Sequence, residues 1–400
     1  MLTSLAYIFI IGLGMAAICE KLKLPRIIGM LFAGILLGPY AFHLLDDSIL
    51  AISSDLREMA LIIILLKAGL SLDLNDLKKV GRPALMMSFV PATFEIIGYI
   101  LIAPLLLDIS ILEAALIGAI LAAVSPAVVI PRMVKLMDEG YGTNKSIPQM
   151  IMSGASCDDI FVIVLFSSFL SMNQGQGVNL ASFLDIPVSI IFGILIGIVV
   201  GLASSFFFEQ QHQHGHTIAN SFKVIIILAL SFALLALEDI ITMSGLLAIV
   251  AMAATIKVKM VNEVSQGLSA KFGKLWLAAE VLLFVLVGAA VDIRYTLSAG
   301  FSAVLVILLA LIFRAIGVAL CMIKTPLNKQ ERLFCVLAYL PKATVQAAIG
   351  SVPLAAGLAC GQLALSIAVL GILITAPLGA IAIDVSYKRL LQNCTNNRAV

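Results

Sequence analysis

The sequence predicts an all-α polytopic membrane protein with about thirteen transmembrane helices. Of its 400 residues, 62% are hydrophobic and 12% are charged, whereas soluble proteins have roughly 45–50% and 25%. Apolar runs of about 20 residues, the length that crosses a bilayer, recur from one end of the chain to the other. These runs are continuous rather than alternating, which excludes an outer-membrane barrel. The formal net charge of +2 indicates no nucleic-acid partner.

Charged and turn-forming residues separate the predicted spans. Each span has a length close to the roughly 20 residues that a transmembrane helix needs. Their approximate limits are 3–19, 25–43, 57–72, 83–107, 111–133, 148–171, 183–206, 219–237, 239–256, 275–291, 296–322, 332–357 and 361–383.

The basic residues of the loops and span ends fall almost entirely on one side of the membrane. If the N-terminus is outside, only Arg57 and Arg294 lie on the outer side. The positive-inside rule therefore places the N-terminus outside and the C-terminus in the cytoplasm. Lys21 and Lys23 follow the first apolar segment rather than precede it. We expect this segment to be an uncleaved helix, and the protein to be integral to the plasma (inner) membrane.

No pattern in the sequence indicates a cofactor or a resident metal. The six cysteines lack the CxxC spacing of metal and redox sites. His212, His214 and His216 stand in a polar segment, where a solvated cytoplasmic loop is the favoured interpretation and a metal-binding or pH-sensing role is the alternative. We therefore expect no cofactor and look for function in the charges within the spans.

Asp158 and Asp159 are the only charged residues between positions 146 and 184, and isolated ionisable groups in a membrane are costly enough to suggest function. Adjacent side chains on a helix point about 100° apart, so a single salt bridge cannot satisfy both. Carboxylates can bind a partly dehydrated cation, or hold protons because burial disfavours their charged form. A pair of carboxylates that holds either a cation or protons, but not both at once, is the minimum requirement for exchange. The alternative is that each acid bonds a neighbouring helix and serves packing.

Three further charges lie alone within apolar spans. Lys342 is about ten residues into its span, too deep to reach the surface easily, and we expect it to be the countercharge of an empty dicarboxylate site. Glu95 and Arg314 are the natural ion pair, because buried charges usually pair and neither has a partner in its own helix. Lys67 lies nearer a helix end and can equally snorkel to the surface, and Glu280 is compatible with a place at the inner rim.

Prolines interrupt two spans in corresponding places. The fifth span contains AAVSPAVVIPRM, with Ser125, Pro126 and Pro131. The twelfth contains LPKATVQAAIGSVP, with Pro341 and Thr344. Proline removes a helix hydrogen bond, and breaks within a membrane are tolerated where the backbone is buried or lines a cavity. Paired interrupted helices are the best sequence indication of a transporter site, and ordinary proline kinks are the alternative.

The two interrupted spans are seven spans apart, as are the spans of Glu95 and Arg314. An odd offset reverses direction across the membrane, so we expect the two halves to form an inverted repeat. The prediction is one integral membrane transporter domain over residues 1–400. It consists of a first repeat (1–172), a connector helix and loop (173–218), a second repeat (219–390) and a short cytoplasmic tail (391–400).

At these residues the sequence resembles the monovalent cation:proton antiporter superfamily, and the likeness covers nearly the whole chain. LKLPRIIGMLFAGILLGP (residues 22–39) and LIIILLKAGLSLDLNDLKK resemble early conserved segments of the family. The most specific segments are AVSPAVVIPRM, GASCDDIFVIVLF and LPKATVQAAIG. Together they resemble the NHA-type sodium/proton antiporter branch.

The resemblance implies an elevator-type transporter, with a dimerisation domain and a mobile core domain built around two crossed, broken helices. It implies that Asp159 is the principal cation and proton carrier with Asp158 beside it, and that Lys342 lies close to that site. It also implies that Glu95 pairs with Arg314, and that the protein is a homodimer among membrane lipids. An Asp-Asp pair is associated in the family with electrogenic exchange, but Arg314 leaves the stoichiometry open.

The predicted function is secondary antiport of Na⁺ or Li⁺ against H⁺, by a protein that is not an enzyme and holds no metal beyond the transported ion. The alternatives are a K⁺/H⁺ antiporter and a sodium-coupled organic-anion symporter of similar fold. A passive channel would need rings of polar groups rather than isolated charges. An intramembrane aspartyl protease would need two aspartates from different helices, whereas Asp158 and Asp159 are consecutive.

Overall fold

The computed structural model describes residues 1–71, 81–174, 180–213, 219–238, 240–241 and 243–393. Within these ranges all the regular secondary structure is helical, apart from one isolated β-bridge between Tyr141 and Asn393. The predicted all-α fold is therefore confirmed. His214 and His216 lie outside the described residues, as does the side chain of His212.

Nine helical segments of the described chain are long and apolar enough to cross a membrane. Two shorter apolar helical segments cover Arg26–Leu37 and Thr344–Ala355. The protein is thus an integral membrane protein, as predicted. The number of about thirteen spans stays a prediction, because some of the predicted spans correspond to short or interrupted helices. The predicted span 332–357, for example, is divided among three helices.

The chain forms two compact units. Unit 1 comprises Met1–Ser54, Asp73–Val162 and Phe284–Val400, and unit 2 comprises Asp55–Leu72 and Ile163–Leu283. Each unit therefore draws residues from both of the predicted repeats. The repeat boundaries themselves stay a prediction.

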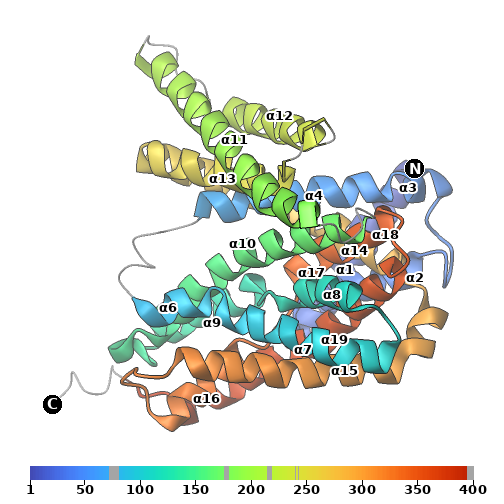
Figure 1. Cartoon of the computed structure of the whole chain (residues 1–400), viewed down its shortest axis with the longest axis vertical. Helices are drawn as coiled ribbons and strands as arrows, with labels where there is room; N and C mark the ends of the chain where they lie inside the picture. Colours follow the sequence, from blue (N-terminus) through green and yellow to red (C-terminus); the bar gives the residue numbers. More distant parts are fainter. Residues whose placement is uncertain (72–80, 175–179, 214–218, 239, 242, 394–400) are drawn as a thin grey trace. The chain divides into compact units, whose positions relative to one another are not determined.

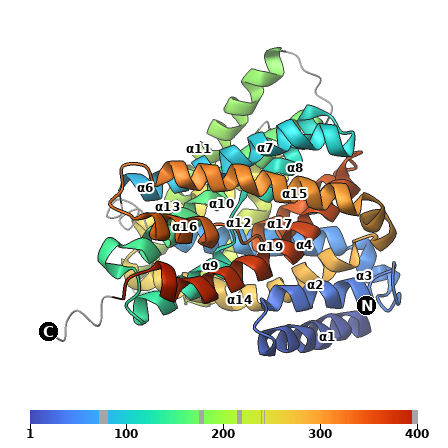
Figure 2. The ribbon, with the colours of Figure 1, turned by 90° about the horizontal axis from the view of Figure 1, so that it is seen from below.

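In unit 1, α15 lies along α7 and α1 lies along α2 (Figure 1; Figure 2). The helices of this unit are α1 (Leu2–Lys21), α2 (Arg26–Leu37), α3 (Asp47–Ala51), α6 (Arg82–Met87), α7 (Val90–Leu107), α8 (Ile111–Ala122), α9 (Pro126–Asp138), a 3-10 turn (Thr143–Lys145), α15 (Ile293–Cys321), α16 (Lys329–Ala338), α17 (Thr344–Gly350), α18 (Val352–Ala355) and α19 (Gly361–Leu390).

Unit 2 is built on α11 and α13, which pack closely. Gly193 and Gly197 of α11 meet the backbone of Ser244 and Ala248, so a Cβ at either glycine would collide with it. The helices within this unit are α11 (Leu180–Gln213), α12 (Asn220–Glu238) and α13 (Gly245–Lys259). Residues of both units occur in α4 (Ser53–Ser71), α10 (Ile147–Asn173) and α14 (Asn262–Ala289).

The interruption of the fifth predicted span follows from its sequence. Helix α8 ends at Ala122, and α9 begins at Pro126 after three residues that are not helical. Proline suits the first helical position, because its missing N–H is not needed there, and it pushes the preceding Ser125 into extended backbone. Pro131, which was expected to belong to the break, lies inside α9 and does not end it. A proline within a helix removes its own hydrogen bond, and membrane helices accommodate this loss.

The twelfth predicted span is interrupted in the same manner. Helix α16 ends at Ala338, and α17 begins at Thr344. Pro341 lies in the non-helical stretch between them, where it cannot continue a helix. The order of elements also recurs. A helix with one predicted buried charge (α7 or α15) precedes a broken helix, and the long α10 or α19 follows it.

One end of unit 1 gathers loops that contain basic residues, among them Lys145 and Arg82. Lys145 Nζ donates hydrogen bonds of 3.0 and 2.8 Å to the two carboxylate oxygens of Glu331, which is fully buried. Nearby in sequence, the Gly142 N–H donates to the Gln392 carbonyl at 2.9 Å. These bonds tie the start of α10, the start of α16 and the segment after α19 to one another. The helix that carries Asp158 is thereby anchored within this unit.

Candidate functional site

The two helix interruptions lie side by side in the interior of unit 1. The Ser125 N–H donates to the Pro341 carbonyl at 2.8 Å. The Gln346 Nε2 donates to the Ala123 carbonyl at 2.8 Å. A non-helical stretch exposes backbone N–H and C=O groups that must find partners when buried. The two breaks therefore form a shared polar centre in the interior of unit 1.

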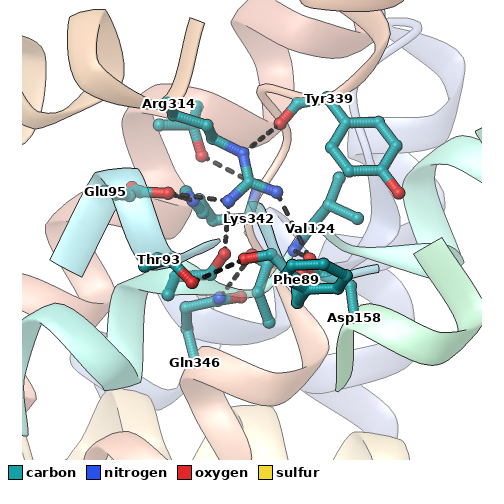
Figure 3. Close-up of polar contacts among 12 residues, drawn as sticks. Phe89, Thr93, Glu95, Val124, Asp158, Arg314, Tyr339, Lys342 and Gln346 are labelled. Atoms are coloured by element: carbon teal, nitrogen blue, oxygen red, sulfur yellow. Dashed lines mark hydrogen bonds and ion pairs between the residues drawn. The ribbon is translucent and has the colours of Figure 1, made fainter. Parts of the chain in front are cut away.

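Arg314 of α15 lies at this centre and is fully buried (Figure 3). Its Nε donates to the Tyr339 carbonyl at 2.5 Å, and its Nη1 donates to the Ala122 carbonyl. These carbonyls lie at the C-terminal ends of α16 and α8, where a helix carries partial negative charge. Nη1 also donates to Glu95 Oε2 at 2.8 Å, and Nη2 to Asp158 Oδ2 at 3.3 Å. One guanidinium thus binds two carboxylates and two half-helix ends.

Glu95 of α7 forms ion pairs with two basic side chains. Its Oε2 lies 2.8 Å from Arg314 Nη1, and 2.5 Å from Lys342 Nζ. The structure thus contains the ion pair that the sequence suggests between Glu95 and Arg314. That Lys342 acts as the countercharge of an empty dicarboxylate site stays a prediction. The ion pair of Lys342 is with Glu95, and the cation on Asp158 is Arg314.

The backbone explains the partner of Lys342. This residue lies in the non-helical stretch, where its own N–H donates to Thr375 Oγ1 of α19 at 2.9 Å. Asp158 Oδ2 is already occupied by two donors, the Val124 N–H at 2.8 Å and Arg314. From this position Lys342 Nζ reaches Glu95 Oε2, which also accepts from Arg314 Nη1.

Asp158 and Asp159 are both buried, with 0% and 7% of their surface exposed. Among the described residues, the Oδ1 atoms of both acids and Ser125 Oγ have no hydrogen-bond partner. A buried oxygen without a donor is costly, and binding a cation or a proton would satisfy it. Asp159 is also absent from the ion pairs of the described chain, whereas Asp158 is paired with Arg314. The arrangement can bind a cation or protons at oxygens that the protein leaves available.

The remaining predicted residues lie elsewhere or have other surroundings. In unit 2, Lys67 Nζ is 5.9 Å from the ring centroid of Trp276, and Glu280 lies one turn along the same helix as Trp276. Thr344 is buried at the first position of α17. Among the described residues, no group of three or more His, Cys, Asp or Glu side chains is arranged to hold a metal.

The sequence reasoning missed Gln346, Thr375 and the backbone partners at Ala122, Val124 and Tyr339. Gln346 gave a weak signal, since it is an uncharged polar residue in a segment of apolar and small residues. The backbone partners gave none, because any residue supplies an N–H or a carbonyl. Only the folded arrangement of the two breaks shows which of these groups are used.

Comparison with known proteins gives similarities in sequence and in fold. Residues 5–385 match the family model described as "Sodium/hydrogen exchanger, transmembrane". Human sodium/hydrogen exchanger 9B2 is 32% identical over 407 residues, covering 97% of this chain and 74% of the relative. Human sodium/hydrogen exchanger 9B1 is 31% identical over 386 residues, covering 92% and 73%.

The structural comparison shows a similarity of fold. The sodium proton antiporter MjNhaP1 from Methanocaldococcus jannaschii, solved at pH 8, superposes with a TM-score of 0.80. The match covers 96% of this chain and 97% of that one, with 22% sequence identity. A second structure of the same antiporter gives a TM-score of 0.72. At this level of identity the similarity establishes a common fold.

Proposed function

Because the chain belongs to the sodium/hydrogen exchanger family, we propose that it is a secondary active antiporter that exchanges Na⁺ for H⁺ across the membrane. Cation/proton antiport is the coarse function that the family supports. The finer proposal is that Asp158 and Asp159 bind the exchanged ions. The observation that carries it is the position of these two buried acids beside the paired helix breaks, each with an oxygen that has no donor among the described residues.

Asp159 is proposed as the principal carrier. The negative charge of Asp158 is compensated by Arg314, and that of Glu95 is compensated by Arg314 and Lys342. In this group of four residues two negative charges balance two positive charges. Asp159 adds one negative charge that no ion pair of the described chain compensates. One Na⁺ or one proton neutralises it, so the two ions compete for the same charge.

The transport cycle follows from this competition. Cytoplasmic Na⁺ displaces the proton from Asp159 and is bound by oxygens of Asp159 and Asp158, since Na⁺ is a hard cation that prefers oxygen ligands. The site then becomes accessible from the other side by an elevator-type movement. External protons displace the Na⁺, and the protonated site returns. The inward proton gradient thus drives Na⁺ out of the cell.

We propose that the protein acts in the plasma (inner) membrane as a homodimer, with the N-terminus outside and the C-terminus in the cytoplasm. The basic loops that gather at one end of unit 1 support this orientation. The two structural units support a division into a core and a dimerisation domain, because one of them contains both broken helices.

We expect purified protein in proteoliposomes to dissipate an acid-inside pH gradient when Na⁺ or Li⁺ is added outside. The rate should saturate with Na⁺ and rise with pH, because protons compete with Na⁺ for Asp159. It should not change when a membrane potential is imposed with K⁺ and valinomycin, because one charge is exchanged for one. A pH indicator trapped in the liposomes measures all three properties.

Three other outcomes of this experiment would contradict the proposal. A response to K⁺ but not to Na⁺ would indicate a K⁺/H⁺ antiporter. Uptake of an organic anion that requires Na⁺, without movement of protons, would indicate a symporter. A response equal to that of protein-free liposomes would remove the assignment altogether.

A further inference from the structure

We infer that Gln346 is a positioning residue that fixes the peptide group holding Asp158, and so directs the unoccupied Oδ1 of Asp158 toward the transported cation. The inference deepens the proposed function and rests on it, since it concerns the same site.

Gln346 connects the two helix breaks through a single side chain. It lies in the first turn of α17 and is fully buried. Its Oε1 accepts a hydrogen bond from the Ala343 N–H at 2.7 Å, within the second break. Its Nε2 donates to the carbonyl of Ala123 in the first break, at 2.8 Å (Figure 3). The first contact holds the carboxamide in a fixed orientation, and the second transmits that orientation across the interface between the breaks.

The acceptor of Gln346 and the donor to Asp158 belong to the same peptide group. The carbonyl of Ala123 and the N–H of Val124 share one plane, and in a trans peptide they point in opposite directions. That N–H donates to Asp158 Oδ2 at 2.8 Å. A rotation of the peptide would turn both groups together. Gln346 therefore fixes the direction of the N–H by holding the carbonyl.

The two carboxylate oxygens of Asp158 have different surroundings. Oδ2 receives the Val124 N–H and Arg314 Nη2, whereas Oδ1 has no donor among the described residues. With Oδ2 held by two donors, the carboxylate plane is set and Oδ1 is presented for binding. If the peptide were free to rotate, one of these donors would be lost. The carboxylate could then turn, and cation binding would have to restore its position.

The chemistry requires glutamine at this position. A glutamate anion accepts from the Ala343 N–H but cannot donate to the Ala123 carbonyl. An asparagine has both kinds of group but is shorter by one methylene. A methionine fills a similar volume and makes neither bond, which leaves a buried N–H and a buried carbonyl without partners.

Gln346→Met and Gln346→Glu test the inference, with Gln362→Met at the start of α19 as the matched control. In proteoliposomes, we expect Gln346→Met to raise the Na⁺ concentration for half-maximal rate by about tenfold. The maximal rate at saturating Na⁺ should fall much less, and the pH profile should move to higher pH because Na⁺ competes less well with protons. In detergent, Na⁺ should raise the melting temperature of the protein as it binds. The Na⁺ concentration at which half of this rise is reached should be higher in Gln346→Met than in the wild type, by the same factor. Gln362→Met should match the wild type in each measurement.

Gln346→Glu separates positioning from a merely structural role. At low pH its neutral carboxyl group can donate to the Ala123 carbonyl, so its half-saturating Na⁺ should approach the wild-type value there and exceed it at high pH. Wild-type half-saturation in Gln346→Met would overturn the inference. If Gln346→Met does not fold, a wild-type half-saturation in Gln346→Glu at every pH would overturn it. A wild type that does not respond to Na⁺ would instead contradict the proposed function.

Discussion

Asp159→Asn should reduce Na⁺-driven dissipation of a pH gradient to the level of protein-free liposomes. Asparagine has nearly the shape of aspartate but carries no charge and cannot exchange a proton. Asp159 is the acid of the cluster without an ion pair in the described chain, so its charge is the one available to Na⁺ and H⁺ in turn. The measurement is the rate of internal pH change after addition of Na⁺ to proteoliposomes of equal protein content.

Asp384→Asn supplies the matched control for this substitution. Asp384 lies on α19 and is paired with Arg132 at a partly exposed position, where an ion pair contributes little to stability. The exchange rate of Asp384→Asn should remain close to the wild-type rate. Asp159→Asn should also melt at no lower temperature than the wild type, because it replaces a buried unpaired charge by a neutral group. Exchange at the wild-type rate in Asp159→Asn would show that this carboxylate is not the carrier.

Arg314→Met should be the most destabilising single substitution within the cluster of buried charges. It removes hydrogen bonds to four acceptors, of which two are carboxylates and two are the carbonyls of Ala122 and Tyr339. Removing one partner of a buried ion pair costs about 3–5 kcal/mol, because the other charge stays buried. Thermal unfolding of the purified protein in detergent measures the loss.

Two further variants identify the origin of this loss. Arg314→Lys keeps the charge but not the planar fork of donors, so its melting temperature should fall between those of Arg314→Met and the wild type. Combining Glu95→Gln with Arg314→Gln should lower the free energy of unfolding by less than the sum of the two single changes, because both single changes remove the same Glu95–Arg314 ion pair and the double variant loses it only once. A melting temperature of Arg314→Met equal to that of the wild type would contradict the central place given to Arg314.

Much of the fold could be predicted because membranes impose simple rules on sequence. A bilayer requires apolar runs of about 20 residues, so most helices were visible as such runs. Pro126 and Pro341 marked the two breaks, since proline cannot supply the helix hydrogen bond that continuity requires. Glu95 and Arg314 could be paired because each is a lone buried charge of opposite sign.

The rest depends on contacts between segments that are distant in sequence. Lys342 could pair with any acid near its break, and only the folded chain brings it to Glu95. Arg314 has five donor N–H groups, and pairing it with one carboxylate left the use of the others open. Pro131 gave the same signal as Pro126, yet its neighbours keep the helix intact around it. The link from Gln346 to Asp158 passes through the Ala123 carbonyl and the next N–H, which no side chain indicates.

The most direct test of a site shared by Na⁺ and H⁺ is the number of protons released when Na⁺ binds. Purified protein in weakly buffered detergent solution, near the pH at which exchange is half-maximal, is titrated with NaCl while a pH indicator records proton release. Choline chloride serves as the control for ionic strength. We expect the wild type to release protons in a saturable manner and Asp159→Asn to release none. Saturable Na⁺ binding by the wild type without proton release, or undiminished release from Asp159→Asn, would contradict the competition between Na⁺ and H⁺ for Asp159.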